Sequence, residues 1–228
     1  MFLWAWERPT DLNFLDTEKV AVAYLEQTLI LSGREVLRKP RRQRLKVPSG
    51  CFLEAVNRVE IDQERAPLLD DRQLSKLAAM VVDSAARPGV KSVQIDFDAP
   101  VSMRPFYRQL VSRVRNSLPE GTGLTMTALA SWVIGDAWLK NMDVDSVVPM
   151  FFRMGADRKN VIQFLRASKP FNTSGKHLAI GVSMDESDIL DVFSRSGGRT
   201  RLRDREIYIF SPGQWEQERL ANTIRKFI

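Results

Sequence analysis

The feature that most constrains the fold is a succession of short β-like runs separated by helical patterns or short connections. Segments with apolar residues at helical spacing follow Asp70 and Pro100, and another covers residues 214–228. Eight strands that alternate with helices are typical of a closed (β/α)8 barrel. We therefore predict an α/β fold, a single compact TIM-type barrel that spans residues 1–228. The eight predicted strands are 2–8, 20–25, 52–62, 92–100, 123–132, 147–154, 178–184 and 206–210.

Residues 28–47 are predicted to form a β-hairpin insertion above the barrel rim, after the second strand. Two β-rich runs flank Ser32-Gly33, and such a turn typically joins antiparallel strands. One interpretation of the basic exit from this hairpin is contact with nucleic acid or an anionic surface, and the other is a solvated arm. We favour the solvated arm and expect no nucleic-acid partner, because no aromatic side chain is interleaved for base stacking. The cations are Arg38, Lys39, Arg41, Arg42, Arg44 and Lys46.

Composition excludes several classes of site. The chain has a single cysteine, Cys51, and a single histidine, His177, so an internal disulfide and a Cys-rich or multi-histidine metal site are excluded. We accordingly expect no metal and no cofactor. No apolar run approaches the roughly 18 residues of a membrane span, and no basic-then-apolar leader is present. The compartment stays open: the location is exported (periplasmic) if a leader has been removed, and otherwise cytoplasmic.

The predicted strand at 92–100 alternates apolar and polar residues, and its polar set is Gln94, Asp96 and Asp98. Strands of a parallel sheet are covered on both faces, so inward polar residues must be paired or functional. In a barrel, acids near the C-terminal end of a strand open into the active-site mouth. The alternative is that Asp98 only caps the following helix.

Four segments together resemble an uncharacterised bacterial family, domain of unknown function 3142, over nearly the whole chain. They are Trp-Ala-Trp-Glu-Arg-Pro at 4–9, Val-Gln-Ile-Asp-Phe-Asp at 93–98, Leu-Thr-Met-Thr-Ala-Leu-Ala-Ser-Trp at 124–132 and Val-Pro-Met-Phe-Phe-Arg-Met-Gly at 148–155. The resemblance implies a single glycosidase-like barrel domain over residues 1–228. It implies no particular activity.

The fourth strand is also similar to that of chitinase-type barrels, which carry an Asp-x-Asp-x-Glu series. This likeness implies that Asp98 stands at the position of the general acid, Asp96 at the carboxylate that orients the N-acetyl group, and Gln94 at the first acid. The sixth strand of those enzymes has Met-x-Tyr-Asp, whereas this chain has Phe152 and Arg153 at the last two positions. A missing hydroxyl and a reversed charge argue against substrate-assisted cleavage of N-acetyl sugars.

The catalytic candidates are Asp98, Asp96 and Glu60. Glycosidases generally use two carboxyl groups that flank the scissile bond. Adjacent strands lie about 5 Å apart, so Glu60 on the third strand could lie close to Asp98 on the fourth. One of the two acids would need a raised pKa to donate a proton at neutral pH. The alternative is that Arg58 and Arg153 neutralise these acids in a structural ion-pair network.

Aromatic side chains matter for sugar binding because the apolar faces of pyranose rings stack on them, and Trp6 and Trp132 are the predicted platforms. Packing within the core is the competing interpretation for both. A short helix is predicted after Gly135, with Asp136 as its N-cap, and His177 precedes a strand and receives no catalytic role. The full predicted substrate-binding set is Trp6, Glu7, Arg58, Gln94, Trp132, Arg153 and Glu186.

Two classes of function follow from these features. The first is a glycoside-hydrolase-like protein that acts on or binds a glycan at the C-terminal mouth of the barrel, which makes it a possible glycoside hydrolase. The second is a non-catalytic barrel that binds a polysaccharide or a protein. The pair Asp96 and Asp98 favours the first, and the departures at Gln94, Phe152 and Arg153 favour the second. Fold likeness alone does not decide between them, and the glycan, the linkage and the oligomeric state stay open.

Overall fold

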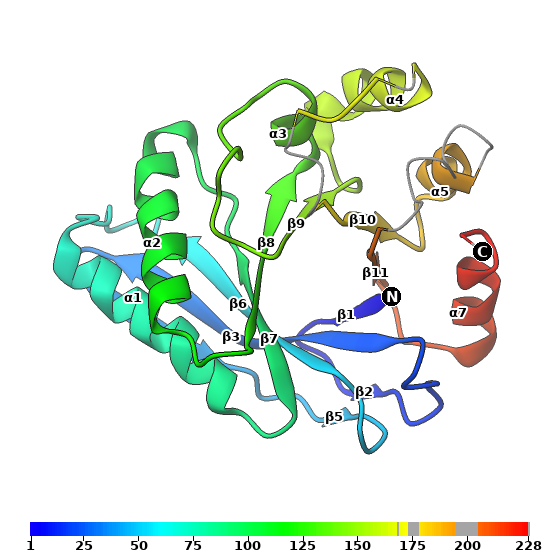
Figure 1. Cartoon of the computed structure of the whole chain (residues 1–228), viewed down its shortest axis with the longest axis horizontal. Helices are drawn as coiled ribbons and strands as arrows, with labels where there is room; N and C mark the ends of the chain where they lie inside the picture. The colour runs from blue at the N-terminus through cyan, green and yellow to red at the C-terminus, as the bar shows by residue number, and fades with distance from the viewer. Residues whose placement is uncertain (168, 173–177, 195–204, 228) are drawn as a thin grey trace.

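The fold is a closed barrel of eight parallel strands, as predicted (Figure 1). The computed structural model describes residues 1–167, 169–172, 178–194 and 205–227. Each strand pairs in parallel with the next along the chain, and the pairing of the last strand with the first closes the ring. The strands are β1 (Phe2–Ala5), β3 (Ala21–Ser32), β6 (Leu53–Ile61), β7 (Val90–Asp96), β8 (Gly123–Leu129), β9 (Ser146–Met150), β10 (Ile180–Ser183) and β11 (Ile207–Phe210).

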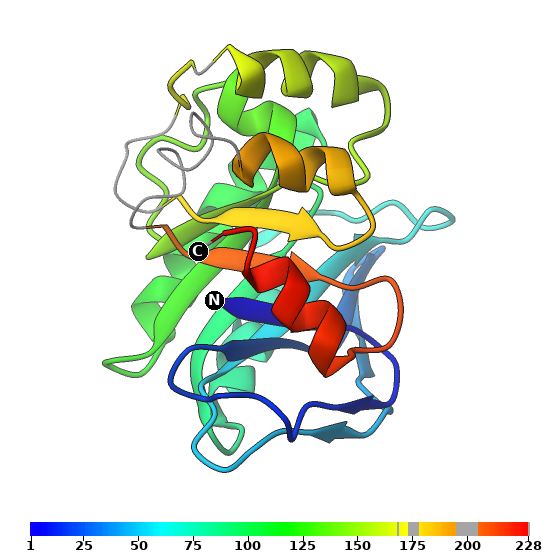
Figure 2. The ribbon, with the colours of Figure 1, turned by 90° about the vertical axis from the view of Figure 1, so that its right-hand side faces the viewer.

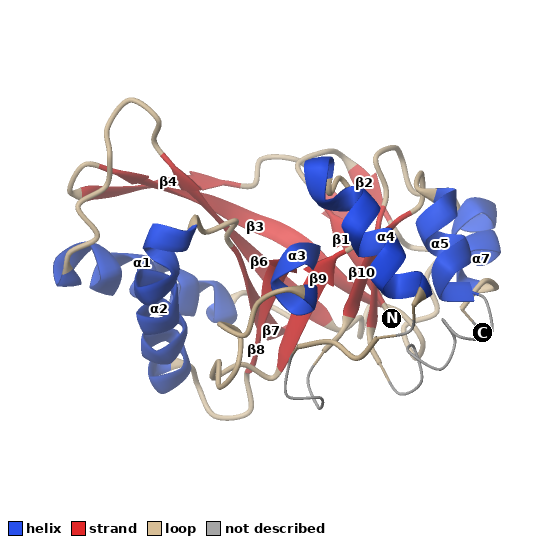
Figure 3. Ribbon diagram, turned by 90° about the horizontal axis from the view of Figure 1, so that it is seen from above, coloured by secondary structure: helices blue, strands red, loops and turns tan. Residues whose placement is uncertain are grey.

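Helices cover the outside of the barrel in two groups. In Figure 3, α1 and α2 lie together under the part of the sheet that extends beyond the barrel, and α4, α5 and α7 lie at the other end. Figure 2 shows α5 and α7 over β10 and β11. The helices are α1 (Asp71–Asp83), α2 (Arg104–Ser117), α3 (Ala130–Ile134), α4 (Arg158–Arg166), α5 (Ser187–Ser194) and α7 (Gln217–Ile224), with short 3-10 turns η1 (Ser84–Ala86), η2 (Val101–Met103) and η3 (Gly155–Asp157).

Alternation along β7 divides its side chains between two cores. Val93, Ile95 and Phe97 are buried in the outer core, which lies between the strands and the helices. Gln94 and Asp96 point into the barrel, where they bond to side chains of other strands. The inner apolar core is small, and it consists of Phe2, Trp4, Ala23, Val56, Val148, Ala179, Tyr208 and Phe210.

The predicted β-hairpin after the second strand is present, and its first arm is a continuation of that barrel strand. Residues 21–32 form the single strand β3, which pairs with β6 as far as Leu31 and Ile61 and carries an irregularity between Leu25 and Gln27. The separate second strand predicted at 20–25 was therefore too short, because a bulge bends a strand without ending it. The antiparallel arm β4 (Glu35–Pro40) pairs with β3, as the turn at Gly33 predicted. Its exit leads to β5 (Leu45–Lys46), which pairs with β2 (Thr10–Asp11).

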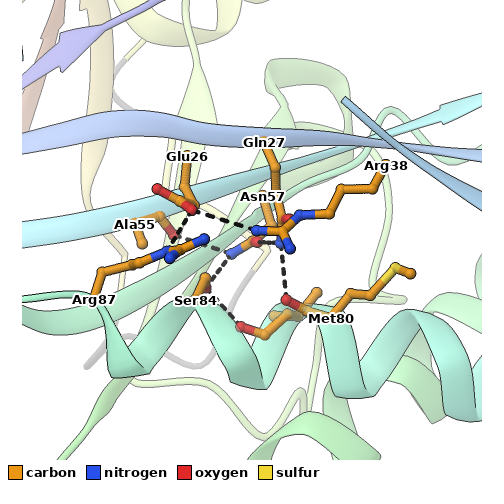
Figure 4. Close-up of polar contacts among 9 residues, drawn as sticks. Glu26, Gln27, Arg38, Ala55, Asn57, Met80, Ser84 and Arg87 are labelled. Carbon is orange, nitrogen blue, oxygen red and sulfur yellow. Dashed lines mark hydrogen bonds and ion pairs between the residues drawn. The ribbon is translucent and has the colours of Figure 1, made fainter. Parts of the chain in front are cut away.

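Buried polar side chains connect the irregular part of β3, around Gln27, to α1 and η1 (Figure 4). The Gln27 amide donates to Asn57 Oδ1 at 2.7 Å and to the carbonyl of Met80 at 2.8 Å. Asn57 in turn donates to Ser84 Oγ at 2.9 Å. Beside them, Glu26 accepts a bond of 2.7 Å from Arg87 Nε. These bonds pair the amide donors of Gln27 and Asn57 and fix the extension of the sheet against the helix.

The structure also corrects the end of the fifth strand. β8 ends at Leu129, and the predicted strand residues up to Trp132 belong to α3. Residues 138–140 form a turn, whereas a short helix was predicted there. Asp136 does not cap a helix; its Oδ1 accepts from the backbone N–H of Trp138 at 3.0 Å, and its other oxygen pairs with Arg104. A short apolar run fits a strand or a helix equally well, which explains the wrong prediction.

Candidate functional site at the C-terminal mouth

Two hollows adjoin at the C-terminal ends of the strands. One has a volume of about 240 Å³, and its lining includes Trp6, Phe152 and Arg153. The other has a volume of about 380 Å³ and lies over the end of β6. Both hollows are lined by Arg58, Asp96 and Asp98. The two aspartates of the predicted catalytic set therefore lie where the hollows meet, and we call the combined feature the mouth.

Asp96 is the last residue of β7, and its side chain is buried. Its Oδ1 accepts a hydrogen bond of 2.7 Å from Thr127 Oγ1 on β8. Burial raises the pKa of Asp96 to about 6, with the bond from Thr127 and the charge of Arg58 opposing and the charges of Asp98 and Glu60 adding to the rise. Asp96 is thus a fixed carboxylate that titrates near neutral pH.

Asp98 follows β7 and presents an exposed side chain to both hollows. Partial burial raises the pKa of the Asp98 carboxyl, and the positive charge of Arg58 opposes this rise. Within the described residues, no hydrogen bond reaches the Asp98 carboxylate. The alternative role as a helix cap fails, because the N-caps of η2 and α2 are Pro100 and Met103, and neither helix has a side-chain cap bond.

The predicted ion-pair network forms only in part. Arg58 Nε lies 2.9 Å from Glu60 Oε1, so Glu60 forms an ion pair with Arg58, as the alternative of a structural ion-pair network predicted. Arg58 stands directly opposite Asp96 across the strand pair. Among the described side chains, however, neither Asp96 nor Asp98 has a basic group within 4 Å, so both acids stay outside the network.

Arg153 lies just beyond β9, and its backbone has a φ of 51°. This left-handed conformation is rare for a residue other than glycine and is found at functional sites. The carboxylate of Glu186 accepts a bond of 2.7 Å from the Arg153 backbone N–H and also pairs with Arg158. The Arg153 guanidinium lies 5.0 Å from the centre of the Phe210 ring. Glu186 therefore holds the loop that carries Arg153.

Trp6 is partly buried, and the segment behind it is clamped by the basic residues that follow β4. The Arg41 guanidinium donates to the carbonyls of Ala5, Trp6 and Arg8 at 2.9, 2.5 and 2.7 Å. One oxygen of Glu7 accepts bonds of 3.0 Å from the backbone N–H groups of residues 42 and 43. Arg41 is thus a structural clamp rather than part of a solvated arm, and Glu7 anchors the same segment.

Two predicted binding residues lie away from the mouth. Gln94 is fully buried inside the barrel, where it accepts a bond of 2.8 Å from Trp4 Nε1. Trp132 lies on α3 and is also buried, with its ring 4.9 Å from that of Trp138 in an edge-on contact and Arg104 over both rings. Neither residue lines the two hollows. His177 lies outside the described residues.

A second buried acid, Glu54 on β6, is absent from the predicted set. Its Oε1 accepts bonds of 2.9 Å from Ser92 Oγ and Thr125 Oγ1 and a longer one of 3.4 Å from Tyr208 Oη, and its Oε2 accepts from Gln94 Nε2 at 3.0 Å. Burial raises its pKa to about 7. Glu54 also borders a cavity of about 700 Å³ lined largely by residues at the N-terminal ends of strands.

The described residues offer no metal site, because no group of three or more His, Cys, Asp or Glu side chains gathers among them. Over the same residues, no helix has the length and apolar character to cross a membrane. The side chains that line the mouth include carboxyl groups, guanidinium groups and aromatic rings.

No family model matches the sequence, and no curated protein matches it either. Solved structures match in fold, and they include the following three. The Bacillus cereus spore cortex-lytic enzyme SleL aligns with a TM-score of 0.53 at 16% identity, over 80% of this chain and 50% of its own. A Rhizomucor miehei chitinase aligns with 0.51 at 13% identity, over 80% and 68%. A Streptomyces coelicolor protein named as a candidate chitinase A aligns with 0.58 at 10% identity, over 99% and 94%.

At these identities the likeness shows the fold alone. The chain spans half the length of SleL and nearly all of the Streptomyces coelicolor protein. The barrel therefore has a fold similar to those of these three proteins. The activity of the site has to be argued from its own residues.

Proposed function

We propose that the protein is a glycoside hydrolase, formed by a single domain over residues 1–228, that cleaves a glycan across its mouth. The observation that carries the proposal is the position of Asp96 and Asp98 where two hollows adjoin. A glycan that crosses this point has sugar units on both sides of the two carboxyl groups. Glycoside hydrolases generally use two carboxyl groups that flank the scissile bond, and the position of Asp96 and Asp98 provides such a pair.

Asp98 is the proposed proton donor. Its carboxyl is exposed to the mouth and lacks a hydrogen bond within the described chain, so it is free to reach the glycosidic oxygen. Burial raises the pKa of Asp98, which is the direction that favours a general acid. The carboxyl protonates the departing oxygen and becomes a carboxylate as the glycosidic C–O bond breaks. A water molecule then supplies a hydroxyl to the anomeric carbon, and its proton restores the Asp98 carboxyl.

Asp96 is the proposed partner that remains ionised. With a pKa of about 6, it is mostly a carboxylate at pH 7, and Thr127 fixes one of its oxygens. A carboxylate at this place stabilises the positive charge that develops on the sugar ring. Glu60, the other predicted partner, is held by Arg58 and is the weaker candidate.

Trp6 and Phe152 supply the apolar surface for the sugar ring. Phe152 stacks on Phe210 with ring centres 5.4 Å apart, and its ring also contacts Trp4. Because Phe152 has no hydroxyl and Arg153 is cationic, the proposal includes no assistance by an N-acetyl group. The same two residues favour the second candidate function, a barrel that binds a glycan without cleaving it.

The test is the release of reducing ends from a panel of bacterial and plant polysaccharides. Wild type, Asp98→Asn and Asp143→Asn are compared, the last being a matched loss of an exposed carboxylate far from the mouth. Release that is lost only in Asp98→Asn supports the hydrolase. If no polysaccharide is cleaved while glycan binding survives in Asp98→Asn, the non-catalytic function replaces it.

A further inference from the structure

Arg153 is a cation that the protein holds in place, and it has no ionic partner in the described part of the chain. Its backbone is kept in the left-handed conformation by the bond to Glu186, and its guanidinium lies against the Phe210 ring. No carboxylate of the described residues comes within 4 Å of it. Yet three carboxylates, Asp96, Asp98 and Asp157, line the same hollow. The protein thus keeps Arg153 apart from the acids around it.

Arg58 supplies a second guanidinium to this hollow from another strand. It projects from β6, whereas Arg153 follows β9. Arg58 is engaged through Nε with Glu60, and its side chain is 46% exposed, so part of its hydrogen-bonding capacity is open to the mouth. Two guanidinium groups, one on β6 and one beyond β9, therefore line the hollow that also holds Trp6.

A guanidinium presents a planar fork of N–H donors that matches the two oxygens of a carboxylate. A neutral sugar accepts single hydrogen bonds and leaves most of that fork unpaired once the hollow is closed off from water. A sugar that carries a carboxylate satisfies the fork and brings the opposite charge to Arg153. The aromatic side chains nearby accept the apolar face of the same ring.

We propose that the hollow beside Arg153 binds a carboxylated sugar, so that the substrate is an acidic glycan with Arg153 as its specificity-determining residue. Arg58 assists from β6. This inference rests on the proposed function for its site, but it makes a separate claim about the ligand.

The test measures binding of carboxylated oligosaccharides and of the same oligosaccharides after their carboxyl groups have been reduced to alcohols. The probes are oligogalacturonates, alginate oligomers and glycan strands that contain N-acetylmuramic acid. Calorimetry is performed in the Asp98→Asn background, so that nothing is cleaved, with Arg153→Asn added. Asparagine tolerates a positive φ, so the loop keeps its conformation. Arg44→Gln, which removes an exposed cation of the basic segment, is the matched control for general charge attraction.

We expect at least one carboxylated probe to bind ten or more times tighter than its reduced form. Arg153→Asn abolishes this preference and Arg44→Gln leaves it intact, while thermal unfolding shows both variants to be folded. Equal binding of the reduced and carboxylated forms, or no binding of any carboxylated probe, overturns the inference. If a neutral glycan is cleaved with dependence on Asp98, the hydrolase stands and this inference falls. A carboxylate preference without cleavage supports the inference and contradicts the hydrolase.

Discussion

The barrel buries carboxyl groups at two levels, and their surroundings differ. Glu54 lies deep in the barrel, where Ser92, Thr125, Gln94 and Tyr208 all donate to its oxygens. At the mouth, one bond reaches Asp96 from Thr127, and none reaches Asp98 from the described residues. Burial raises the pKa at both levels.

The difference between Glu54 and the acids of the mouth shows that a raised pKa does not by itself identify a catalytic acid. The deep acid has its hydrogen-bonding capacity filled by the protein, which is typical of a group that holds strands together. The acids at the mouth keep unfilled capacity beside open hollows, which is typical of groups that meet a ligand.

Replacement of Asp98 by asparagine should lower kcat/KM for the cleaved glycan by about 10²- to 10⁴-fold, because the general acid is lost. The free energy of unfolding should change by less than about 0.5 kcal/mol, because the side chain is exposed and makes no bond to the described chain. Steady-state kinetics and urea unfolding measure the two quantities. Unchanged kinetics would show that Asp98 is not the proton donor.

Replacement of Glu54 by alanine should lower the stability of the protein and leave glycan binding unchanged, which is the opposite of the effect expected for Asp98→Asn. It leaves four buried donors without an acceptor and should reduce the free energy of unfolding by about 3 kcal/mol. Glycan affinity of the folded fraction should be unchanged, because Glu54 does not line the mouth. Urea unfolding and calorimetry at low temperature test this. A mild stability loss with a large loss of affinity would reverse the assignment of the two levels.

Replacement of Glu54 by glutamine should remove a pH dependence of stability. The unfolded carboxyl ionises near pH 4.5, whereas the folded one stays protonated up to about pH 7. Stabilisation from the protonated form is therefore complete below pH 4.5 and is lost as pH rises to 7, by about 3 kcal/mol. The difference in unfolding free energy between wild type and variant, measured from pH 4 to pH 8, reports this loss. A constant difference would show that the Glu54 pKa is not raised.

Replacement of Trp6 by alanine should weaken glycan binding by about tenfold, because the stacking surface at the mouth is lost. Trp132→Phe is the control: it should leave glycan binding unchanged, because Trp132 packs against Trp138 outside the mouth. Calorimetry with an oligosaccharide that wild type binds compares the two. Equal losses would show that the α3 region takes part in binding.

The strand at 92–100 could be interpreted from the sequence because its alternation is strict. Gln94 and Asp96 point into the barrel, and Asp98 reaches the mouth, as period 2 and barrel geometry require. Glu54 could not be found in this way, because apolar residues lie on both faces of the strand at 52–62. Its burial depends on its depth in the barrel, which only the closed ring defines.

The contacts of Arg41 and Glu7 could not be predicted from the sequence either, for a different reason. They depend on the path that residues 41–46 take back to the end of β1, and an irregular segment has no periodicity to reveal its path. The length of β3 was missed because a bulge shifts the alternation by one residue. Trp132 was placed at a strand end because a short apolar run does not distinguish a strand from a helix.

The account requires that the glycan binds at the mouth, where Asp96 and Asp98 lie. Fluorine NMR of the Asp98→Asn protein, labelled with fluorotryptophan, tests this requirement directly. An oligosaccharide from a polysaccharide that wild type cleaves or binds is titrated in, and each resonance is assigned by tryptophan-to-phenylalanine variants. We predict that the Trp6 resonance shifts with saturation while those of Trp4 and Trp132 stay in place. Saturable shifts at Trp132, or a Trp6 resonance that does not move while the oligosaccharide binds, would contradict the claim.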